Sequence, residues 1–361
     1  MFTNNTSQLM KINIKNKLIG DECPVFFIAE AGVNHNGSIK NAIKLVDIAS
    51  QSGADAIKFQ TFTAQEINTR KAPKSSYHIK STGTDEDLSW FDLLKSQELS
   101  LDMHEKIIKY CTKLGIIFLS TPYGFESVDM LEKLNVPAYK IASSDSNNLQ
   151  LIEYIAKKGK PVFASTGMSD IDDVERLVST VKSTGLKDIV LLQCTGNYPS
   201  KIEDSNLNVL KTFRKKFDCL IGYSDHSEDY INAIAATALG ISVFEKHFTI
   251  DKKLPGPDHI MSLNPEGLRK TIKFIRDTEK SLGMLEKIVL KSESENSKKL
   301  KRSLISAKFI SKGTKISFDM ITSKRPGYGI PPNKFKEIIN SIAKEDIPKE
   351  TFFNKNMFSK K

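Results

Sequence analysis

The sequence has few cysteines, no long apolar run and no apolar leader. Its four cysteines lie far apart in a chain of 361 residues and form no Cys-x-x-Cys pair, so we expect reduced thiols rather than disulfides. No run of about 18 apolar residues occurs, and the opening segment, residues 1–17, lacks the apolar core of a secretory signal. These absences predict a soluble, cytoplasmic protein with no membrane partner.

The net charge of +10 is spread unevenly along the chain. Residues 285–361 hold 18 lysines and arginines against 8 aspartates and glutamates, whereas residues 1–284 hold 35 of each. The lysines of the basic segment are interleaved with Ser, Asn and Ile in no pattern that is typical of nucleic-acid recognition. We therefore expect a solvated basic face and no nucleic-acid partner. The alternative is a basic module that lies near an anionic substrate.

Eight short β-branched or aromatic runs recur along the first 250 residues, each followed by a segment with helical spacing. They are VFFIAEAG (25–32), DAIKFQT (55–61), GIIFLST (115–121), AYKIAS (138–143), PVFAST (161–166), IVLLQCT (189–195), CLIGYSD (219–225) and ISVFEKHF (241–248). No Gly-x-Gly-x-x-Gly follows the first run, which argues against a doubly wound dinucleotide-binding sheet. Eight strand-helix units predict an α/β fold of the (β/α)8 TIM-barrel type over residues 1–284.

Three other segments do not fit the strand-helix repeat. Residues 62–100 are too long for a strand-to-helix loop and are expected to form an insertion at the barrel mouth. Residues 285–300 are polar and unpatterned, which indicates a linker. Residues 301–361 show short alternating runs around a Lys-Gly-Thr turn, which predicts a small β-rich module.

Polar residues stand at the end of every predicted strand. They are Glu30, Lys58, Gln60, Ser120, Thr121, Lys140, Ser143, Ser165, Thr166, Thr195, Ser224, Asp225, His226, Glu245, Lys246 and His247. The catalytic groups of a (β/α)8 barrel lie at the C-terminal ends of its strands. One such residue would carry little information, because Ser and Thr often close a barrel interior. Polar ends on all eight strands indicate a functional site.

Two lysines among these residues point to an anionic ligand. Lys58 shares a face of its strand with Gln60, because alternate residues of a strand point the same way. A buried lysine is costly unless it is paired or takes part in chemistry, so Lys58 and Lys140 together predict a bound polyanion. The alternative for each lysine is an end-of-strand side chain that extends to solvent.

Two histidines end neighbouring predicted strands. His226 shares a face with Ser224, and His247 shares a face with Glu245. Two neutral imidazoles with nearby water and carboxylate oxygens suit a divalent metal in an open catalytic arrangement, with Mn²⁺ favoured and Mg²⁺ or Co²⁺ as alternatives. The competing interpretation is that each imidazole binds a loop carbonyl.

Ten short motifs occur in order along nearly the whole chain. They are AEAGVNHNG, IKFQTF, LSTPYGFESVDML, YKIAS, STGM, CTGNYP, GYSDH, EKHFT, GPDH and KRPGYG. With these motifs the sequence resembles the sialic acid synthase family, whose members make N-acetylneuraminate, legionaminate or pseudaminate. The resemblance implies a TIM barrel followed by an antifreeze-like (SAF) domain. It also implies a metal-dependent condensation of phosphoenolpyruvate with an N-acetylated hexosamine of the N-acetylmannosamine type, giving a nonulosonic acid and phosphate.

The resemblance further implies roles for individual residues, with Glu30, Lys58, Lys140 and Glu245 as the catalytic set. It assigns the metal to His226 and His247, phosphoenolpyruvate to Lys58, Lys140, Ser143, Ser165 and Ser224, and the sugar side to Glu30, Gln60, Tyr198 and Asp258, with Thr121 near the junction. Glu245 would stabilise cationic character on the enol carbon or help water attack there. Arg325 would reach the N-acetyl group of the sugar bound in the other subunit of a domain-swapped homodimer.

Two positions depart from the family pattern. Asp145 stands where Glu is usual, and Gly196 stands where Asn or Thr is usual. Both are expected near the substrates, with Asp145 among the substrate-binding residues, so the departures leave the identity of the sugar open. The AEAGVNHNG motif fits sialate and legionaminate synthases better than the pseudaminate branch.

Two rival functions compete with the synthase interpretation. A Schiff-base pyruvate aldolase would use Lys58 or Lys140 to form an imine, but that mechanism has no use for the paired histidines. Alternatively, the C-terminal module would be an ice-binding or sugar-binding domain on an inactive barrel. This alternative requires that a main residue of the site be missing from the motifs, and the sequence has a suitable residue at each main position.

Overall fold

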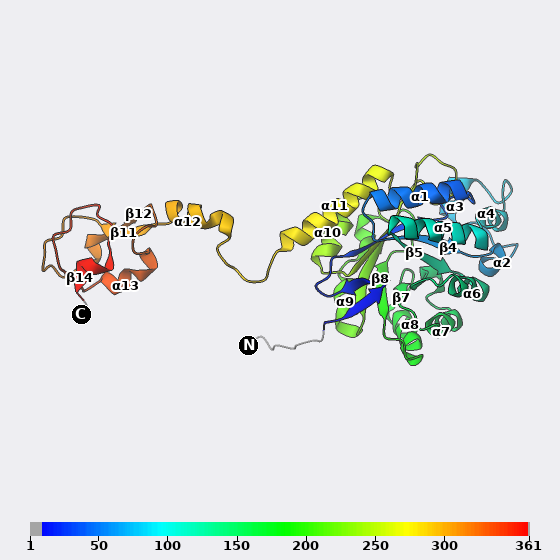
Figure 1. Ribbon diagram of the computed structural model, residues 1–361, viewed down its shortest axis with the longest axis horizontal. Coiled ribbons are helices and arrows are strands. Elements are labelled where there is room, and N and C mark those ends of the chain that lie inside the picture. Colours follow the sequence, from blue (N-terminus) through cyan, green and yellow to red (C-terminus); the bar gives the residue numbers. More distant parts are fainter. Residues whose placement is uncertain (1–8, 360–361) are drawn as a thin grey trace. The chain divides into compact units, whose positions relative to one another are not determined.

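The computed structural model describes residues 9–359. Eight parallel strands form one sheet, and this sheet lies at the centre of the first unit (Figure 1). The strands are β3 (Phe26–Gly32), β4 (Ala56–Thr61), β5 (Ile117–Pro122), β6 (Tyr139–Ile141), β7 (Val162–Ser165), β8 (Ile189–Cys194), β9 (Leu220–Asp225) and β10 (Val243–His247). Their order is β5-β4-β3-β10-β9-β8-β7-β6, and β5 and β6 contact each other to close the ring. Each predicted strand overlaps one of the eight, so the predicted barrel is confirmed.

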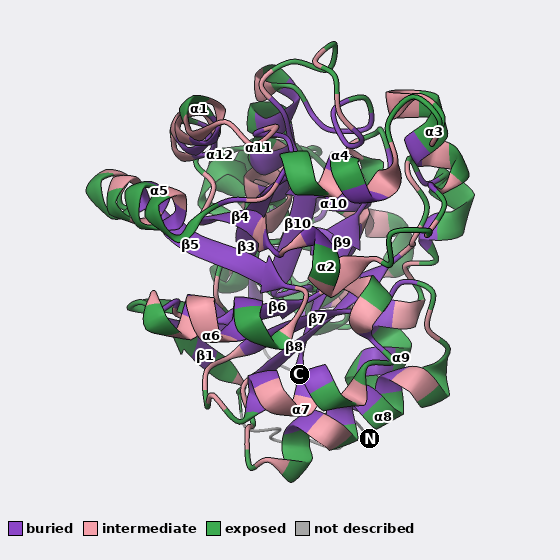
Figure 2. Cartoon of the chain, turned by 90° about the vertical axis from the view of Figure 1, so that its right-hand side faces the viewer, coloured by how far each residue is buried: buried purple, intermediate pink, exposed green. Residues whose placement is uncertain are grey.

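Helices cover the outside of the barrel. They are α1 (Ile39–Gln51), α5 (Leu101–Leu114), α6 (Phe125–Lys133), α7 (Leu149–Ala156), α8 (Ile171–Ser183), α9 (Val209–Lys216), α10 (Ile231–Ala238) and α11 (Pro265–Leu282). Side-chain oxygens of Ser38, Ser100 and Asp170 accept backbone N–H groups at the starts of α1, α5 and α8 and so define where these helices begin. Buried residues gather on the strands and on the inner sides of the helices (Figure 2). Within residues 9–359, none of the helices is both long and apolar enough to span a membrane.

The interior of the barrel is apolar near the N-terminal ends of the strands. Inward-facing residues such as Phe26, Ile28, Phe163 and Leu192 form one buried cluster. An antiparallel hairpin of β1 (Lys11–Ile14) and β2 (Lys17–Gly20) adds Ile12, Ile14 and Ile19 to this cluster. The eight-run pattern does not include this hairpin. Because alternate residues of each strand face inward, the inward row continues toward the C-terminal ends, where polar residues replace the apolar ones.

The insertion between β4 and α5 carries three short helices, α2 (Ala64–Ile67), α3 (Ser76–Thr82) and α4 (Trp90–Ser96). Glu66 of α2 attaches it to the start of α6, since its carboxylate accepts the Ser127 backbone N–H at 3.0 Å and the Ser127 hydroxyl at 2.6 Å. Gly124 leaves room for this contact, because a Cβ there would lie 2.2 Å from Glu66 Oε1. The insertion is therefore fixed beside the C-terminal end of β5.

The chain divides into two compact units, and the second begins at Met284. Its elements are β11 (Ser303–Ser306), β12 (Ile321–Lys324), β13 (Ile342–Ala343), β14 (Phe358–Ser359), α13 (Phe335–Ile338) and the 3-10 turns η4 (Phe318–Met320), η5 (Pro332–Lys334) and η6 (Lys355–Met357). Leu304, Ile316 and Phe353 belong to a hydrophobic core that this unit forms on its own. The stretch 285–300, expected as an unpatterned linker, contains the 3-10 turn η3 (Lys291–Glu293) and the helix α12 (Ser294–Leu300), neither of which buries a residue.

Candidate active site

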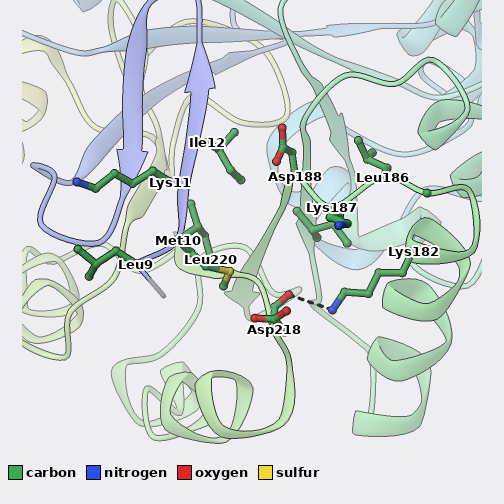
Figure 3. Close-up of a pocket in the computed structure, with 12 residues that line it drawn as sticks. Leu9, Met10, Lys11, Ile12, Lys182, Leu186, Lys187, Asp188, Asp218 and Leu220 are labelled. Atoms are coloured by element: carbon green, nitrogen blue, oxygen red, sulfur yellow. Dashed lines mark hydrogen bonds between the residues drawn. The ribbon is translucent and has the colours of Figure 1, made fainter. Parts of the chain in front are cut away.

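A surface pocket of about 670 Å³ lies beside the N-terminal ends of β8 and β9 (Figure 3). Met10 and Ile12 line it together with Asp188 and Leu220, which lie at the starts of the two strands. Lys182 donates a hydrogen bond to the Asp218 carbonyl at 3.0 Å. The catalytic groups of a (β/α)8 barrel come from the opposite ends of the strands, so this pocket is not the candidate active site.

The C-terminal ends of the strands enclose a polar pocket of about 50 Å³. Its lining residues are Glu30, Lys58, Gln60, Thr121, Tyr123, Lys140, Ala142, Ser143, Ser165, Cys194, Tyr198, Ser224, His226, Glu245 and His247. All predicted site residues except Asp145, Asp258 and Arg325 line it. The pocket therefore lies at the C-terminal ends of the strands, where the polar residues of the sequence predicted a site.

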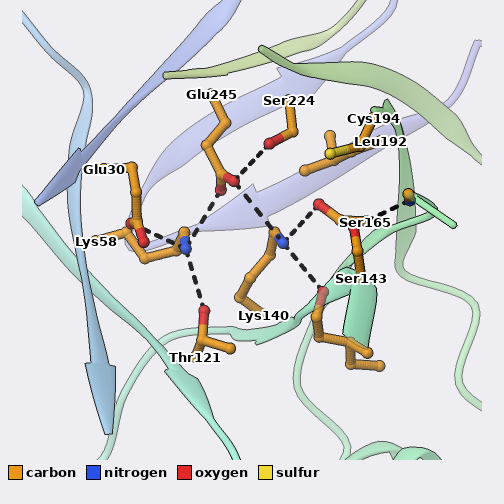
Figure 4. Close-up of polar contacts among 12 residues, drawn as sticks. Glu30, Lys58, Thr121, Lys140, Ser143, Ser165, Leu192, Cys194, Ser224 and Glu245 are labelled. Carbon is orange, nitrogen blue, oxygen red and sulfur yellow. Dashed lines mark hydrogen bonds and ion pairs between the residues drawn. The ribbon is translucent and has the colours of Figure 1, made fainter. Parts of the chain in front are cut away.

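Lys58 of β4 is held between two buried carboxylates (Figure 4). Its Nζ lies 2.9 Å from Glu30 Oε2 and 3.7 Å from Glu245 Oε2. Nζ also donates to Thr121 Oγ1 at 3.1 Å. Burial alone would lower the pKa of Lys58, but the carboxylates of Glu245 and Glu30 raise it above its ordinary value. Lys58 is therefore a fixed ammonium group.

Lys140 of β6 lies on the other side of Glu245. Its Nζ is 3.8 Å from Glu245 Oε1 and donates to Ser165 Oγ at 2.6 Å. Burial lowers the pKa of Lys140. Burial would raise the pKa of Glu245, but Lys140 and Lys58 together lower it below its ordinary value. Since Ser224 Oγ also donates to Glu245 Oε1 at 2.9 Å, Glu245 is a charged carboxylate between two ammonium groups.

Glu30 behaves differently from Glu245. Its side chain is buried, and burial raises its pKa from 4.5 to about 7, against the opposing effect of Lys58. Glu245 adds to the rise through charge repulsion. At neutral pH the Glu30 carboxyl therefore exchanges between its protonated and ionised forms.

We expect Glu30→Gln to stabilise the fold at pH 8 but not at pH 4.5. With a pKa of about 7 in the folded state and 4.5 in the unfolded chain, the folded state binds more protons between these values. The free energy of unfolding of the wild type therefore falls as the pH rises from 4.5 to about 7, by on the order of 3 kcal/mol. Glutamine has no such proton, so urea unfolding at both pH values tests the prediction. Parallel pH profiles of the two proteins would contradict it.

His226 and His247 face each other at the ends of β9 and β10, with ring centroids 5.4 Å apart. The Nδ1–H of His226 donates to the Thr195 carbonyl at 2.8 Å, so in the neutral imidazole Nε2 keeps its lone pair. His247 Nδ1 is buried without a hydrogen-bond partner, and Asp258 Oδ2 lies 3.8 Å from it. An unpartnered buried nitrogen beside a second imidazole fits a shared ion.

The two histidines are not part of a larger preformed metal cluster. Across residues 9–359, no three or more His, Cys, Asp and Glu side chains are grouped so that they could hold a metal. A metal at His226 and His247 would take its remaining ligands from water or from substrate oxygens, which corresponds to the open arrangement expected of a catalytic ion.

An aromatic stack borders the pocket. The ring of Tyr198 packs on His226 at 4.1 Å between centroids and stacks with Tyr77 at 5.2 Å. Tyr77 belongs to α3, so the insertion contributes a side chain next to the site. Sequence reasoning missed this residue, because nothing in the pattern of residues 62–100 indicates which side chain turns toward the barrel.

Sequence reasoning also missed Cys194 and Tyr123. Cys194 lies two residues after the inward-facing Leu192, and its Sγ is 3.7 Å from His226 Nδ1. Tyr123 lies two residues after Thr121, so strand parity applied to β5 and β8 identifies both. Thr195, which was expected among the polar strand ends, instead donates its hydroxyl to the Asp204 carbonyl at 2.8 Å and is not part of the lining.

Three of the residues expected to bind substrate lie outside the lining. Asp258 is adjacent to it through His247, and burial raises its pKa to about 6. Asp145 ends the 3-10 turn η1 (Ser143–Asp145), where its carboxylate accepts the Ser144 hydroxyl at 3.1 Å. Arg325 belongs to the second unit.

Comparisons with known proteins place this barrel in a family. The NeuB family matches residues 45–287, and the SAF domain matches residues 301–359. An N,N'-diacetyllegionaminic acid synthase of Campylobacter jejuni is 39% identical over 325 residues, which is 90% of this chain and 97% of that protein. A pseudaminic acid synthase of the same species is 34% identical over 323 residues, covering 90% and 93% of the two chains.

A solved structure agrees with these matches. The crystal structure of N-acetylneuraminic acid (sialic acid) synthetase from Leptospira borgpetersenii, in complex with citrate, has a TM-score of 0.69 and 31% identity, and covers 80% of this chain and 95% of that one. Eight strands, the polar pocket at their ends and the C-terminal SAF domain occur together as the ten motifs predicted. The chain therefore belongs to the NeuB family, whose members include sialic, legionaminic and pseudaminic acid synthases.

Proposed function

We propose that the protein condenses phosphoenolpyruvate with an N-acetylated amino sugar of the N-acetylmannosamine type, forming a nonulosonic acid and releasing phosphate. The observation that carries this proposal is the convergence of Lys58 and Lys140 on Glu245 inside a NeuB-family barrel. Two buried ammonium groups suit a small ligand that carries both a carboxylate and a phosphate. The names of the related synthases support a sugar as the second substrate.

Phosphoenolpyruvate would lie against the two lysines and three hydroxyl groups. Ser165 already accepts from Lys140 at 2.6 Å, and Ser224 donates to Glu245 at 2.9 Å. Ser143 Oγ accepts the Gly167 backbone N–H at 3.0 Å, which orients its hydroxyl group in the lining of the pocket. These groups would hold the anion in one orientation, which supplies the proximity that a reaction of two substrates needs.

Glu245 is suited to the charge that develops during condensation. When the methylene carbon of phosphoenolpyruvate forms a bond to the aldehyde carbon of the sugar, positive charge develops on the carbon that bears the phosphate. A carboxylate whose pKa is held low by Lys140 and Lys58 stabilises that charge or takes a proton from the attacking water. After water adds, phosphate leaves with its bridging oxygen.

His226 and His247 would hold a divalent metal, with Mn²⁺ favoured and Mg²⁺ or Co²⁺ as alternatives. The unpartnered Nδ1 of His247 supports this part of the proposal. When bound there, such an ion makes the aldehyde more electrophilic. Glu30, Gln60, Tyr198 and Asp258 would then face the sugar, as the resemblance implies, and Asp145 would lie near the substrates.

A substrate panel tests the proposed function. Purified full-length protein is incubated with phosphoenolpyruvate, Mn²⁺ and each of N-acetylmannosamine, 2,4-diacetamido-2,4,6-trideoxymannose and its altrose isomer, and the products are analysed by mass spectrometry. We expect one sugar to give a nonulosonic acid together with phosphate. Borohydride trapping of pyruvate on Lys58 or Lys140, with no condensation of any sugar, would support the aldolase alternative instead.

We expect Lys58→Ala to raise the KM for phosphoenolpyruvate about tenfold or more, and Lys58→Arg to raise it far less. Lys58 is a fixed ammonium group, and a hydrogen bond to a charged group is worth about 1.5–3 kcal/mol. Arginine keeps the charge, which alanine removes. Steady-state kinetics with each substrate varied in turn checks the assignment. Equal changes in the KM values for the sugar and phosphoenolpyruvate would argue against it.

The second unit has a proposed role at the site of another subunit. We infer a domain-swapped homodimer in which Arg325 binds the N-acetyl group of the sugar held by the partner's barrel. The support is the resemblance of the KRPGYG motif and the match of residues 301–359 to the SAF domain.

A further inference from the structure

The ends of β9 and β10 are joined by three consecutive cross-strand pairs. Ser224 lies opposite Glu245 and Asp225 opposite Lys246, and His226 faces His247 one step further along. Alternate residues of a strand face opposite sides, so the first and third pairs point into the pocket and the middle pair points toward the helices. The proposed reaction uses the inward pairs and leaves the middle pair without a role.

The middle pair is a fully buried ion pair. Asp225 is 1% exposed and Lys246 is 2% exposed. The ammonium group of Lys246 contacts Asp225 Oδ2 and donates to the carbonyls of Ser227 at 2.8 Å and Asp229 at 3.1 Å. These contacts use all three hydrogens of the ammonium group. The Asp225 Oδ1 atom accepts the Ser227 backbone N–H at 3.0 Å.

These contacts fix the loop that directly follows His226. Ser227 is bound at both its N–H and its carbonyl, and Asp229 is bound at its carbonyl. On the other side, the carbonyl of His226 accepts the Ser200 backbone N–H at 2.9 Å. A buried ion pair gives little net stability over an apolar pair of the same shape, because removing both charges from water is costly. Fold stability alone therefore does not account for this pair.

We propose that Asp225 and Lys246 are positioning residues that set the orientation of the His226 imidazole opposite His247. Each residue of the pair is the chain neighbour of one of the histidines, and neither lines the pocket. The pair thus acts through the backbone of residues 226–229 and touches no substrate. The effect on metal binding rests on the proposed function. The orientation of the His226 imidazole does not, because it is a property of the protein without metal or substrate.

Two variants of the pair, together with one control, test the inference in the full-length protein. Lys246→Met leaves the Asp225 carboxylate buried without its cation, whereas Asp225→Asn/Lys246→Met removes both charges. The double variant is expected to fold even where the single variant does not, yet it still lacks the bonds to the Ser227 and Asp229 carbonyls. The matched control is Phe244→Leu, because Phe244 is buried on the same outward row of β10, two residues earlier.

The first measurement is NMR of protein labelled with ¹⁵N-histidine. In the wild type and in Phe244→Leu, we expect His226 to hold a single tautomer with its proton on Nδ1, as the bond to the Thr195 carbonyl requires. In the double variant, the two tautomers are expected to exchange. The second measurement is Mn²⁺ affinity, expected to fall about tenfold or more in the double variant, as is usual when groups that orient a ligating histidine are lost.

The outcomes separate this inference from the proposed function. A double variant that keeps the wild-type tautomer and Mn²⁺ affinity would overturn the inference. A comparable loss in Phe244→Leu would also overturn it, because the effect would then follow from destabilisation alone. If the wild type binds no Mn²⁺, the metal site of the proposed function fails, and the tautomer of His226 in the double variant decides the positioning role by itself.

Discussion

Replacing either His226 or His247 with alanine is expected to lower the rate of the synthase reaction about a thousandfold or more, with the barrel still folded. The proposed metal would stabilise the charge that develops in the transition state by several kcal/mol. Each 1.36 kcal/mol of transition-state stabilisation corresponds to a factor of ten in rate. Burial lowers the pKa of His247 well below its ordinary value, so this imidazole is neutral and removing it leaves no charge uncompensated. Turnover is measured with both substrates saturating, and folding is checked by circular dichroism.

Two controls accompany this prediction. His104→Gln alters a histidine that is also buried but lies outside the pocket, where it bonds to Thr61, and it is expected to retain activity. Exhaustive chelation should reduce the wild type to the level of His247→Ala, and added Mn²⁺ should restore only the wild type. Full turnover after chelation would refute the metal hypothesis.

Deleting residues 301–361 is expected to abolish synthase activity and leave a folded barrel. The barrel unit and the second unit each have a hydrophobic core of their own, so we expect the barrel to keep its core when the second unit is removed. The expected loss reflects the missing Arg325, which we propose serves the partner subunit's site. Arg325→Ala alone should therefore reproduce most of the loss, as measured by kinetics with the sugar varied.

Mixing two inactive variants tests the domain swap. One carries His247→Ala and the other Arg325→Ala, and dimers are allowed to exchange subunits. In a swapped heterodimer one site has both defects and the other has neither, so activity should reappear. Absence of recovery despite proven heterodimers would mean that each second unit serves its own barrel.

The polar pocket could be predicted from the sequence because side chains alternate between the two faces of a strand with a period of two residues. Lys58, Lys140 and Glu245 stand at the ends of apolar runs, where a buried charge has no structural explanation, and the structure brings the three together. Cys194 was missed because a cysteine is compatible with an apolar strand. Its position in the inward row of β8 was nevertheless predictable from parity.

Other features depend on contacts that no local pattern reveals. The strands of the β1–β2 hairpin are four residues each, too short to show a clear alternation, and their burial comes from the barrel interior that they cover. The Tyr77 contact arises from the path of the insertion. The raised pKa of Glu30 requires both its burial and the nearby Glu245, which are properties of the folded barrel.

The most direct test of the central claim follows the bridging oxygen of phosphoenolpyruvate. Wild-type protein with Mn²⁺ and the preferred sugar is supplied with phosphoenolpyruvate labelled with ¹⁸O between carbon and phosphorus. Attack of water on the enol carbon breaks the carbon–oxygen bond, so the account predicts that the label leaves with phosphate and that phosphate appears only when the sugar is present. Label retained in the organic product, or phosphate released without sugar, would contradict the proposed condensation.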